Sequence, residues 1–236
     1  MNPLLDVMVV GAFRSGTNLM KHLLEENFDV KCSFNAWGWK HALAPTLVSP
    51  SAPGHLSPTA PLIVMVKEPV QQNVSLFHHW TRTRPGLVGG RAFGEFIRSD
   101  FLVHDNSYGG RGPKYLFPTP TDYWNQFYFS YVFWEDAAPR LKLIRLEQLE
   151  NDTASVLERL ERTFMLSRRP SFNPVIPRNR LIPTPDGQQS RMLPSETHRA
   201  DFAVSSEDRA FILMRASPIV LDAVYPGSGG GESMSA

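Results

Sequence analysis

The composition of this 236-residue chain is that of an ordinary globular protein, with 42% hydrophobic residues and a formal charge of +1 from 24 basic and 23 acidic side chains. Such a balance gives no general attraction for nucleic acid or membranes, so any anion must be bound by local groups. The single cysteine, Cys32, excludes an internal disulfide. Because no apolar run approaches a membrane span and no leader-like stretch precedes the first strand, we expect a cytoplasmic protein.

The first predicted element is a buried strand over residues 6–10, which runs into a glycine-containing turn and then into a helix near 16–28. The apolar residues of this helix recur at helical spacing, so one of its faces can pack on a sheet. Gly11 and Gly16 allow a tight turn whose N–H groups point inward, and the start of the helix adds unpaired donors. This strand, loop and helix predict a site for a phosphate-like anion.

The side chains of the loop distinguish it from an ATP- or GTP-binding P-loop. Thr17 stands where such a loop needs Lys, and Asn18 stands where it needs the Ser or Thr that holds magnesium. The only cation of the turn is Arg14, whose guanidinium can bind an oxyanion together with the hydroxyls of Ser15 and Thr17. We therefore expect a tetrahedral oxyanion and no metal ion at this loop.

A second buried strand is predicted over residues 61–66, and it ends in Lys67. Pro69 suits the first turn of the helix that follows, near 70–81. Ser75 lies eight residues after Lys67, within this helix. We expect Lys67 and Ser75 to converge on a further phosphate.

The rest of the chain continues the alternation of strands and helices, which predicts an α/β fold with three layers, a central parallel sheet with helices on both faces, P-loop NTPase-like. Residues 1–226 are expected to form a single domain, and residues 227–236 a disordered tail. Long connections over 45–61 and 82–121 are natural walls for an acceptor pocket. The further predicted strands are 30–36 and 141–146, and the further predicted helices are 92–102, 123–135, 152–164 and 205–224.

Taken together, these segments resemble the P-loop sulfotransferases that use 3′-phosphoadenosine 5′-phosphosulfate (PAPS). The family's first motif binds the 5′-phosphosulfate, and it is matched here by Arg14, Ser15, Gly16, Thr17 and Asn18. Its second motif, an Arg-x-Pro strand end with a Ser eight residues later, binds the 3′-phosphate. That motif is matched by Lys67, Pro69 and Ser75, with Lys in place of Arg. The resemblance covers most of residues 6–150 and includes Trp124-Asn125 and the strand end at 145–149.

The resemblance implies an enzyme that moves a sulfuryl group from PAPS to a hydroxyl or amine of a small-molecule or carbohydrate acceptor, by in-line displacement without a metal. Arg14 would stabilise the charge that develops on the leaving oxygen. Lys40-His41 resembles a Lys and His pair on the family's second strand, in which the His is the base. Neighbours on a strand point to opposite faces, so we expect at most one of them to face the reaction.

Other interpretations remain open. Lys40 and His41 can also be a solvated strand end, with Glu68 or an acid within 95–105 as the base. A P-loop small-molecule kinase shares the strand, loop and helix but needs magnesium and the missing Lys. A non-catalytic nucleotide-binding protein of the same fold would bind the nucleotide without transferring sulfate.

Three further patterns indicate packing more than chemistry. Cys32 is expected to be a small core or sheet residue. The aromatic residues between Trp124 and Trp134 are expected to form a packed helix face. His78-His79 lacks metal-ligand spacing, so we expect this pair on a helix surface or in the acceptor pocket.

Overall fold

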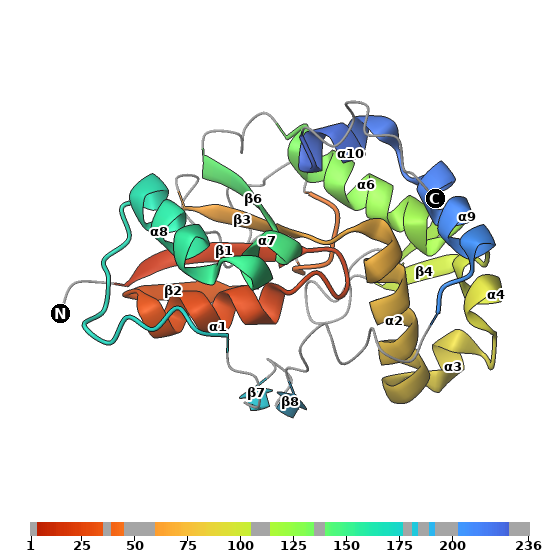
Figure 1. Ribbon diagram of the computed structural model, residues 1–236, viewed down its shortest axis with the longest axis horizontal. Coiled ribbons are helices and arrows are strands. Elements are labelled where there is room, and N and C mark those ends of the chain that lie inside the picture. The colour runs from red at the N-terminus through yellow and green to blue at the C-terminus, as the bar shows by residue number, and fades with distance from the viewer. Residues whose placement is uncertain are drawn as a thin grey trace.

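A parallel sheet of four strands lies at the centre of the computed structural model, with helices on both of its faces (Figure 1). The strand order is β2-β1-β3-β6. This confirms the predicted α/β class with a central parallel sheet, and it is compatible with three layers. The described residues are 4–34, 39–44, 60–104, 114–134, 140–176, 181–183, 189–191 and 203–226.

The predicted strands and helices occur in the predicted order along the chain. The central strands are β1 (Leu5–Gly11), β2 (Val30–Ser33), β3 (Leu62–Val66) and β6 (Leu141–Arg145). Two antiparallel pairs join β4 (Phe101–His104) to β5 (Lys114–Phe117), and β7 (Leu181–Pro183) to β8 (Gln189–Arg191). The helices are α1 (Thr17–Asn27), α2 (Pro69–Thr83), α3 (Pro85–Val88), α4 (Phe93–Ile97), α6 (Pro120–Val132), α7 (Leu146–Asn151), α8 (Thr153–Phe164), α9 (Ser206–Arg215) and α10 (Pro218–Val224).

Alternate residues of β1 contribute to two separate hydrophobic cores. Val7 and Val9 belong to the core shared with α1 and α8, while Met8 and Val10 belong to the core shared with α2 and α6. All four side chains are buried. A parallel strand covered on both faces has to be apolar at every position, which is why β1 is an unbroken apolar run and not an alternating one.

The strand order creates a topological switch point beside β1. From β1 the chain passes through α1 to β2 on one side, whereas β3 and β6 lie on the other side. Right-handed crossovers in opposite directions place the connecting helices on opposite faces. Ligands of open α/β sheets bind at the carboxyl ends of the strands on either side of such a point. Here those ends are Gly11 of β1 and Val66 of β3.

The closing helix predicted over 205–224 is wrong as a single helix. The chain forms α9 and α10, separated at Ala216 and Ser217. Pro218 has no N–H to donate and its fixed φ suits a first helical position, so it ends one helix and begins the next. Asn125 of α6 holds this break, because its amide donates to the carbonyl of Arg215 (2.8 Å) and accepts from the N–H of Ser217 (2.8 Å).

Other boundaries also differ from the prediction. The helix predicted over 92–102 is only α4, because the chain turns into β4 and pairs with β5 inside the connection that we expected to lack strands. The helix predicted over 123–135 begins at Pro120, where the Thr119 hydroxyl accepts from the N–H of Asp122 (3.1 Å). The predicted tail, 227–236, lies outside the described residues. No helix in the described part of the chain is both long and apolar enough to span a bilayer.

Two packing predictions are confirmed. Cys32 is buried in β2 with a free thiol, and burial raises its pKa. The aromatic face of α6 is part of the core, with Trp124, Phe127, Tyr128 and Tyr131 all buried. Several of these rings also reach backbone groups near the candidate site.

Candidate functional site

The predicted anion-binding loop follows β1 and is closed tightly around Gly11. A Cβ atom at Gly11 would lie 2.1 Å from Ser15 Oγ and 2.8 Å from the carbonyl oxygen of Met65. Such distances leave no room for any side chain, so only glycine fits at the exit of β1. The loop therefore folds back so closely that the Ser15 hydroxyl lies against the end of β1.

Two residues of the loop have positive φ angles, Arg14 at 67° and Gly16 at 92°. Gly16 is the N-cap of α1, and a Cβ there would lie 2.7 Å from Leu146 Cδ1. A left-handed conformation is ordinary for glycine but costs energy for arginine. Strain of this kind is commonly held at ligand sites, because the surrounding structure fixes a backbone shape that the ligand needs.

Polar atoms are buried in the loop without hydrogen-bond partners. Arg14 Nε and Ser15 Oγ both lack a partner among the described residues. The Tyr128 hydroxyl lies near Ser15, yet it donates to the carbonyl of Met65 (3.0 Å). Burial, together with the charge of Arg82, lowers the pKa of Arg14. An unpaired buried donor is costly, so a group that accepts a hydrogen bond from Arg14 Nε would stabilise this loop.

Lys40 and His41 lie in a turn beyond β2, not on the strand as predicted. The N–H of Gly11 donates to the carbonyl of Lys40 (3.0 Å), so the turn continues alongside the end of β1. Lys40 Nζ donates to Asn18 Oδ1 (2.6 Å) and lies 3.8 Å from the centre of the Phe34 ring. His41 Nδ1 lies 2.6 Å from the carbonyl oxygen of Gly11.

We expected at most one of these two residues to face the reaction, because neighbours on a strand point to opposite faces. That expectation stays a prediction, although the two residues lie in a turn, which does not follow this alternation. Both Lys40 and His41 contact the loop, one through Asn18 and the other through Gly11.

The turn is held in place by hydroxyl groups of α6. Tyr123 donates to the carbonyl of His41 (2.8 Å), and Tyr131 donates to the carbonyl of Ala42 (3.2 Å). Ser130 Oγ accepts from the N–H of Ala44 (2.9 Å). From the sequence, Tyr131 was predicted only to pack on the helix face, and Tyr123 was given no role. The signal was tyrosine at positions where phenylalanine would fill the core equally well, since a buried hydroxyl needs a partner.

The hydrogen bond to Gly11 fixes the tautomer of His41. A carbonyl oxygen can only accept, so Nδ1 carries the proton and Nε2 is left as the acceptor. Burial lowers the pKa of His41 well below its ordinary value, and the charges of Lys40 and Arg14 lower it further. His41 is consequently neutral near pH 7. Its ring stacks on Phe13, with centroids 4.6 Å apart.

A polar face of α2 approaches the same loop. Ser75, His79 and Arg82 are spaced by four and three residues, so they share one face of this helix. Burial lowers the pKa of His79 to about 4, and the nearby charge of Arg14 contributes to that shift. His79 Nδ1 is buried without a hydrogen-bond partner in the described part of the chain. Both histidines lie on α2, and His79 is near Arg14 of the loop. A place for the pair in the acceptor pocket stays a prediction.

Several arginines lie around the loop and form no ion pair with a carboxylate of the described residues. Arg82 and Arg84 act with Arg14 to lower the pKa of His79, and Arg84 acts in the same way on His41. Within the described ranges, none of these three arginines forms an ion pair with a carboxylate. Neither Arg82 nor Arg84 was predicted as a site residue, although the spacing of Arg82 from Ser75 places these two residues on one helix face. Repulsion among such groups favours the binding of a polyanion.

The residues predicted to hold the second phosphate lie at the carboxyl end of β3 and in α2. Lys67 is buried directly after β3, and its carbonyl accepts from Trp124 Nε1 (2.9 Å). Ser75 is half-buried in the middle of α2. No hydrogen bond joins Ser75 to Lys67 among the described residues, so their convergence on a phosphate stays a prediction.

The carboxylates considered as alternative bases serve as helix caps. Glu68 Oε2 accepts from the N–H of Gln71 (2.7 Å) and caps α2, and burial raises its pKa. Within the 95–105 stretch, Glu95 Oε2 accepts from the N–H of Ala92 (2.9 Å) at the start of α4. These contacts give Glu68 and Glu95 a structural role, and the identity of the base stays a prediction.

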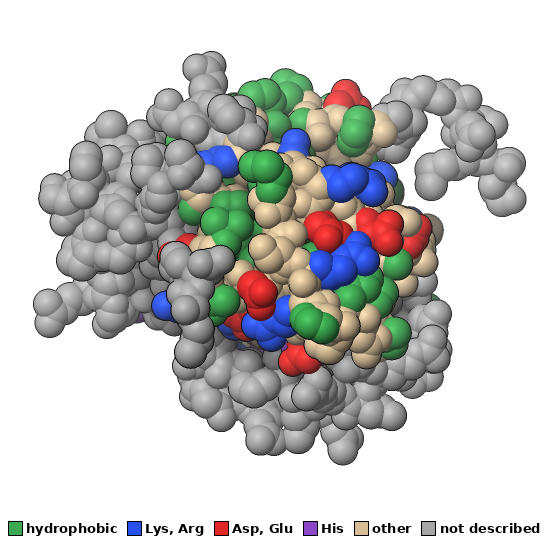
Figure 2. Space-filling model, turned by 90° about the vertical axis from the view of Figure 1, so that its left-hand side faces the viewer, with side chains coloured by type: hydrophobic (Ala, Val, Ile, Leu, Met, Phe, Trp, Pro, Cys, Tyr) green, Lys and Arg blue, Asp and Glu red, His purple; other side chains and the backbone are tan. Residues whose placement is uncertain are grey.

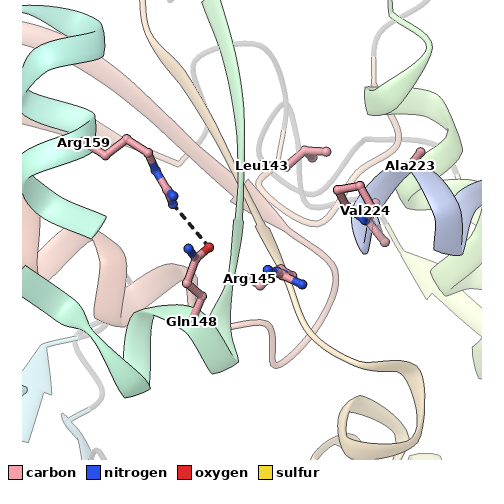
Figure 3. Close-up of a pocket in the computed structure, with 7 residues that line it drawn as sticks. Leu143, Arg145, Gln148, Arg159, Ala223 and Val224 are labelled. Carbon is pink, nitrogen blue, oxygen red and sulfur yellow. Dashed lines mark hydrogen bonds between the residues drawn. The ribbon is translucent and has the colours of Figure 1, made fainter. Parts of the chain in front are cut away.

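A separate cavity of about 230 Å³ lies at the outer edge of β6 (Figure 3). Arg145 of the strand end and Arg159 of α8 line it, and Arg159 donates to Gln148 Oε1 (3.3 Å). Leu143 and Val224 form part of its apolar wall. None of the lining residues belongs to the anion-binding loop, so we treat this cavity as a distinct feature.

Comparison with known proteins gives no family for this chain. No protein-family model matches it, and no curated protein matches it either. Among the described residues, no group of three or more His, Cys, Asp or Glu side chains is arranged to hold a metal ion. The function is therefore inferred from the geometry of the site.

Proposed function

We propose that the chain is a sulfotransferase of the P-loop NTPase-like fold, which moves a sulfuryl group from PAPS to a hydroxyl or amine of a small-molecule or carbohydrate acceptor. One observation carries the proposal. Arginines gather around the loop without any carboxylate partner in the described ranges, and Arg14 Nε and Ser15 Oγ are buried without hydrogen bonds. An anion at the loop would satisfy both the charge and the donors.

The charges around the loop favour a sulfuryl donor over magnesium-ATP. Arg14 and Lys40 already place positive charge beside Gly16, and a divalent cation would be repelled there. Asn18, which stands at the magnesium position of ATP-binding loops, accepts a hydrogen bond from Lys40 instead. A tetrahedral donor that carries its own negative charge fits these groups directly.

Each group near the loop has a role in the proposed reaction. The loop N–H groups and the start of α1 bind the phosphosulfate, with the Arg14 guanidinium where charge develops on the leaving oxygen. The new bond forms between the acceptor oxygen and sulfur as the bond from sulfur to the 5′-phosphate oxygen breaks. The acceptor proton passes to His41 Nε2, whose pKa rises once a bound anion offsets the charges of Lys40 and Arg14.

The positions of Lys67, Ser75 and His79 would set the orientation of the bound donor. Lys67 and Ser75 would hold the 3′-phosphate near the start and middle of the helix. His79 lies one turn beyond Ser75 and acts electrostatically with Arg14 of the loop. An adenylate phosphorylated at both ends would therefore extend from Lys67 towards Arg14.

Calorimetry with adenosine 3′,5′-bisphosphate in magnesium-free buffer tests the donor site. We expect binding of this compound and much weaker binding of 5′-AMP, because only the first has a 3′-phosphate for Lys67 and Ser75. A flat trace would refute the proposal. Binding only of magnesium-ATP would favour the kinase alternative, and bisphosphate binding without transfer to any acceptor offered would favour the non-catalytic one.

A further inference from the structure

The cavity at the outer edge of β6 has no role in the donor site described above. Among the described strands, β6 is the last in the sheet order and pairs with β3. Residues of β6, α7, α8 and α10 border the cavity, whose volume is about 230 Å³. Since about 150 Å³ is enough for benzene in an apolar cavity, this one can hold a ring or a short chain with one polar substituent.

The polar part of the lining consists of Arg145, Gln148 and Arg159, and no carboxylate of the described residues lines the cavity. Arg159 donates to Gln148 Oε1 (3.3 Å), so the amide oxygen of Gln148 is already engaged. In the view of Figure 3, Arg159 and Gln148 lie on one side of β6 and Arg145 on the other, so two walls carry positive charge. Because a guanidinium group can only donate, these walls favour an acceptor that is negatively charged.

Arg145 is the half-buried cation of this lining. Its guanidinium carbon lies 5.5 Å from the centre of the Tyr225 ring, and the Tyr225 hydroxyl donates to Glu147 Oε2 (3.3 Å). Arg145 forms no ion pair and no side-chain hydrogen bond with any described residue. Exposed arginines such as Arg159 are usually only solvated, whereas Arg145 is held against a ring at the wall of a cavity. Its N–H donors are therefore left for a ligand.

The rest of the lining is apolar. Leu143 precedes Arg145 by two residues and so lies on the same face of β6. Val224 and Pro226 contribute from the end of α10 and the chain just after it. Val224 is buried, and Leu143 and Ala223 are half-buried. An apolar surface beside an unpaired guanidinium favours an organic anion over a free inorganic one.

We propose that this cavity binds a small organic oxyanion, a carboxylate or a phosphate monoester on a ring or short chain, as a ligand separate from the sulfuryl donor and its acceptor. Arg145 binds the oxyanion, Arg159 adds positive charge from the other wall, and the apolar part of the ligand packs on Leu143 and Val224. The site does not depend on the proposed function, because none of its lining residues belongs to the anion-binding loop or to α2.

Calorimetry with matched probes tests the class of ligand. Benzoate and phenyl phosphate carry the two oxyanions on the same ring, benzamide is the neutral counterpart of benzoate, and inorganic phosphate lacks the ring. We expect one of the two organic anions to bind about tenfold more tightly than benzamide and inorganic phosphate, because charge and apolar contact act together. The tighter of the two anions identifies the oxyanion that the site prefers.

Variants of the lining test where the preferred anion binds. Arg145→Gln should weaken its binding about tenfold, and Ala223→Leu should weaken it to a similar extent by filling the cavity without a change of charge. Arg159→Gln, at an exposed position, should give a smaller loss and repeats the charge test if Arg145→Gln does not fold. Lys142→Gln is the matched control, since it removes an exposed charge of the same strand outside the lining. Lys142→Gln and the loop variant Arg14→Ala should both keep the wild-type affinity.

Each other outcome overturns the inference. Organic anions that bind no more tightly than benzamide would exclude an anion site. A loss in Arg14→Ala with unchanged binding in Arg145→Gln would assign the anion to the donor loop. A loss in Arg145→Gln with unchanged binding in Ala223→Leu would reduce the site to a surface charge without the cavity. Absence of adenosine 3′,5′-bisphosphate binding, by contrast, would refute the proposed function and leave this site unaffected.

Discussion

Two sets of arginines in this protein differ in their partners. Arg98, Arg168, Arg169 and Arg215 each lie against a carboxylate, for example Arg215 against Asp122 at 2.7 Å. On the face shown in Figure 2, positive and negative side chains likewise adjoin one another. Around the loop the pattern is the opposite, because Arg14, Arg82 and Arg84 have no such partner among the described residues.

Under the proposed function, the paired arginines serve the fold and the unpaired ones serve a ligand. Paired surface arginines connect neighbouring elements, as Arg215 connects α9 to α6. Burial and the nearby charge of Arg82 make the charge of Arg14 costly, whereas Arg82 and Arg84 are exposed. Under the proposed function, a bound anion offsets the cost at Arg14.

The largest expected effect comes from Arg14. We expect Arg14→Ala to lower sulfate transfer from PAPS by about 10²–10³-fold, because a donor to the developing charge is lost. Urea unfolding should show little loss of stability, since Arg14 has no ion pair among the described residues to lose and only its packing contacts are removed. Arg215→Ala is the contrasting control, with about 1 kcal/mol less stability from its broken ion pair and unchanged transfer. Full transfer activity in Arg14→Ala would remove the mechanism.

The next effect concerns the base. His41→Ala should reduce transfer by at least about 10²-fold, because no other group takes the acceptor proton. Calorimetry should find bisphosphate binding intact, since His41 does not hold the donor. An unchanged transfer rate would assign the base role to another residue.

A third prediction tests the close packing of the loop. Gly11→Ala should lower the free energy of unfolding by about 1–3 kcal/mol and weaken bisphosphate binding, because its Cβ would meet Ser15 and the Met65 carbonyl. Gly86→Ala is the matched control, as nothing lies within 4 Å of its Cβ position. Denaturation of both variants under the same conditions gives the comparison. Equal stability of the two would show that the loop adjusts without cost.

A smaller effect is expected at the 3′-phosphate. Lys67→Ala and Ser75→Ala should each reduce the ratio of the affinities for 3′-phosphorylated and 3′-dephosphorylated nucleotide. For Lys67→Ala we expect this ratio to fall by about tenfold, because one charged contact is lost. The affinities for adenosine 3′,5′-bisphosphate and 5′-AMP, measured side by side, give this ratio. If both variants keep the wild-type ratio, the 3′-phosphate is bound elsewhere.

The smallest effect is the pH dependence of stability. The pKa of His79 is about 4 in the folded protein and near 6.5 when unfolded, so the unfolded chain binds more protons between these values. Stability should therefore fall as the pH falls from about 6.5 to 4. In His79→Gln, the free energy of unfolding should fall by about 1 kcal/mol less over this pH range. This figure is reduced because the His79 ring is partly exposed. The exposed His104→Gln is the control, and an identical slope in both variants would contradict the assignment.

Much of the fold was predictable because its signals are local. The unbroken apolar run of β1, the glycines of the loop and the helical spacing after Gly16 each depend on neighbouring residues, and the structure confirms the strand, turn and helix. Boundaries were less certain where a proline intervened, as at Pro120 and Pro218. The strands β4 and β5 were missed because their pairing joins segments across a long connection.

The residues alone determined the parallel sheet and the cation-bearing loop at the end of β1, since periodicity and glycine conformation act over a few positions. Only the tertiary structure decided which side chains meet there. The hydroxyls of Tyr123 and Tyr131 hold His41 beside Gly11, although these residues are far apart in the chain. The missing carboxylate partners of Arg82 and Arg84 are likewise a property of the folded protein, because ion pairing depends on distances that the chain sets only when it packs.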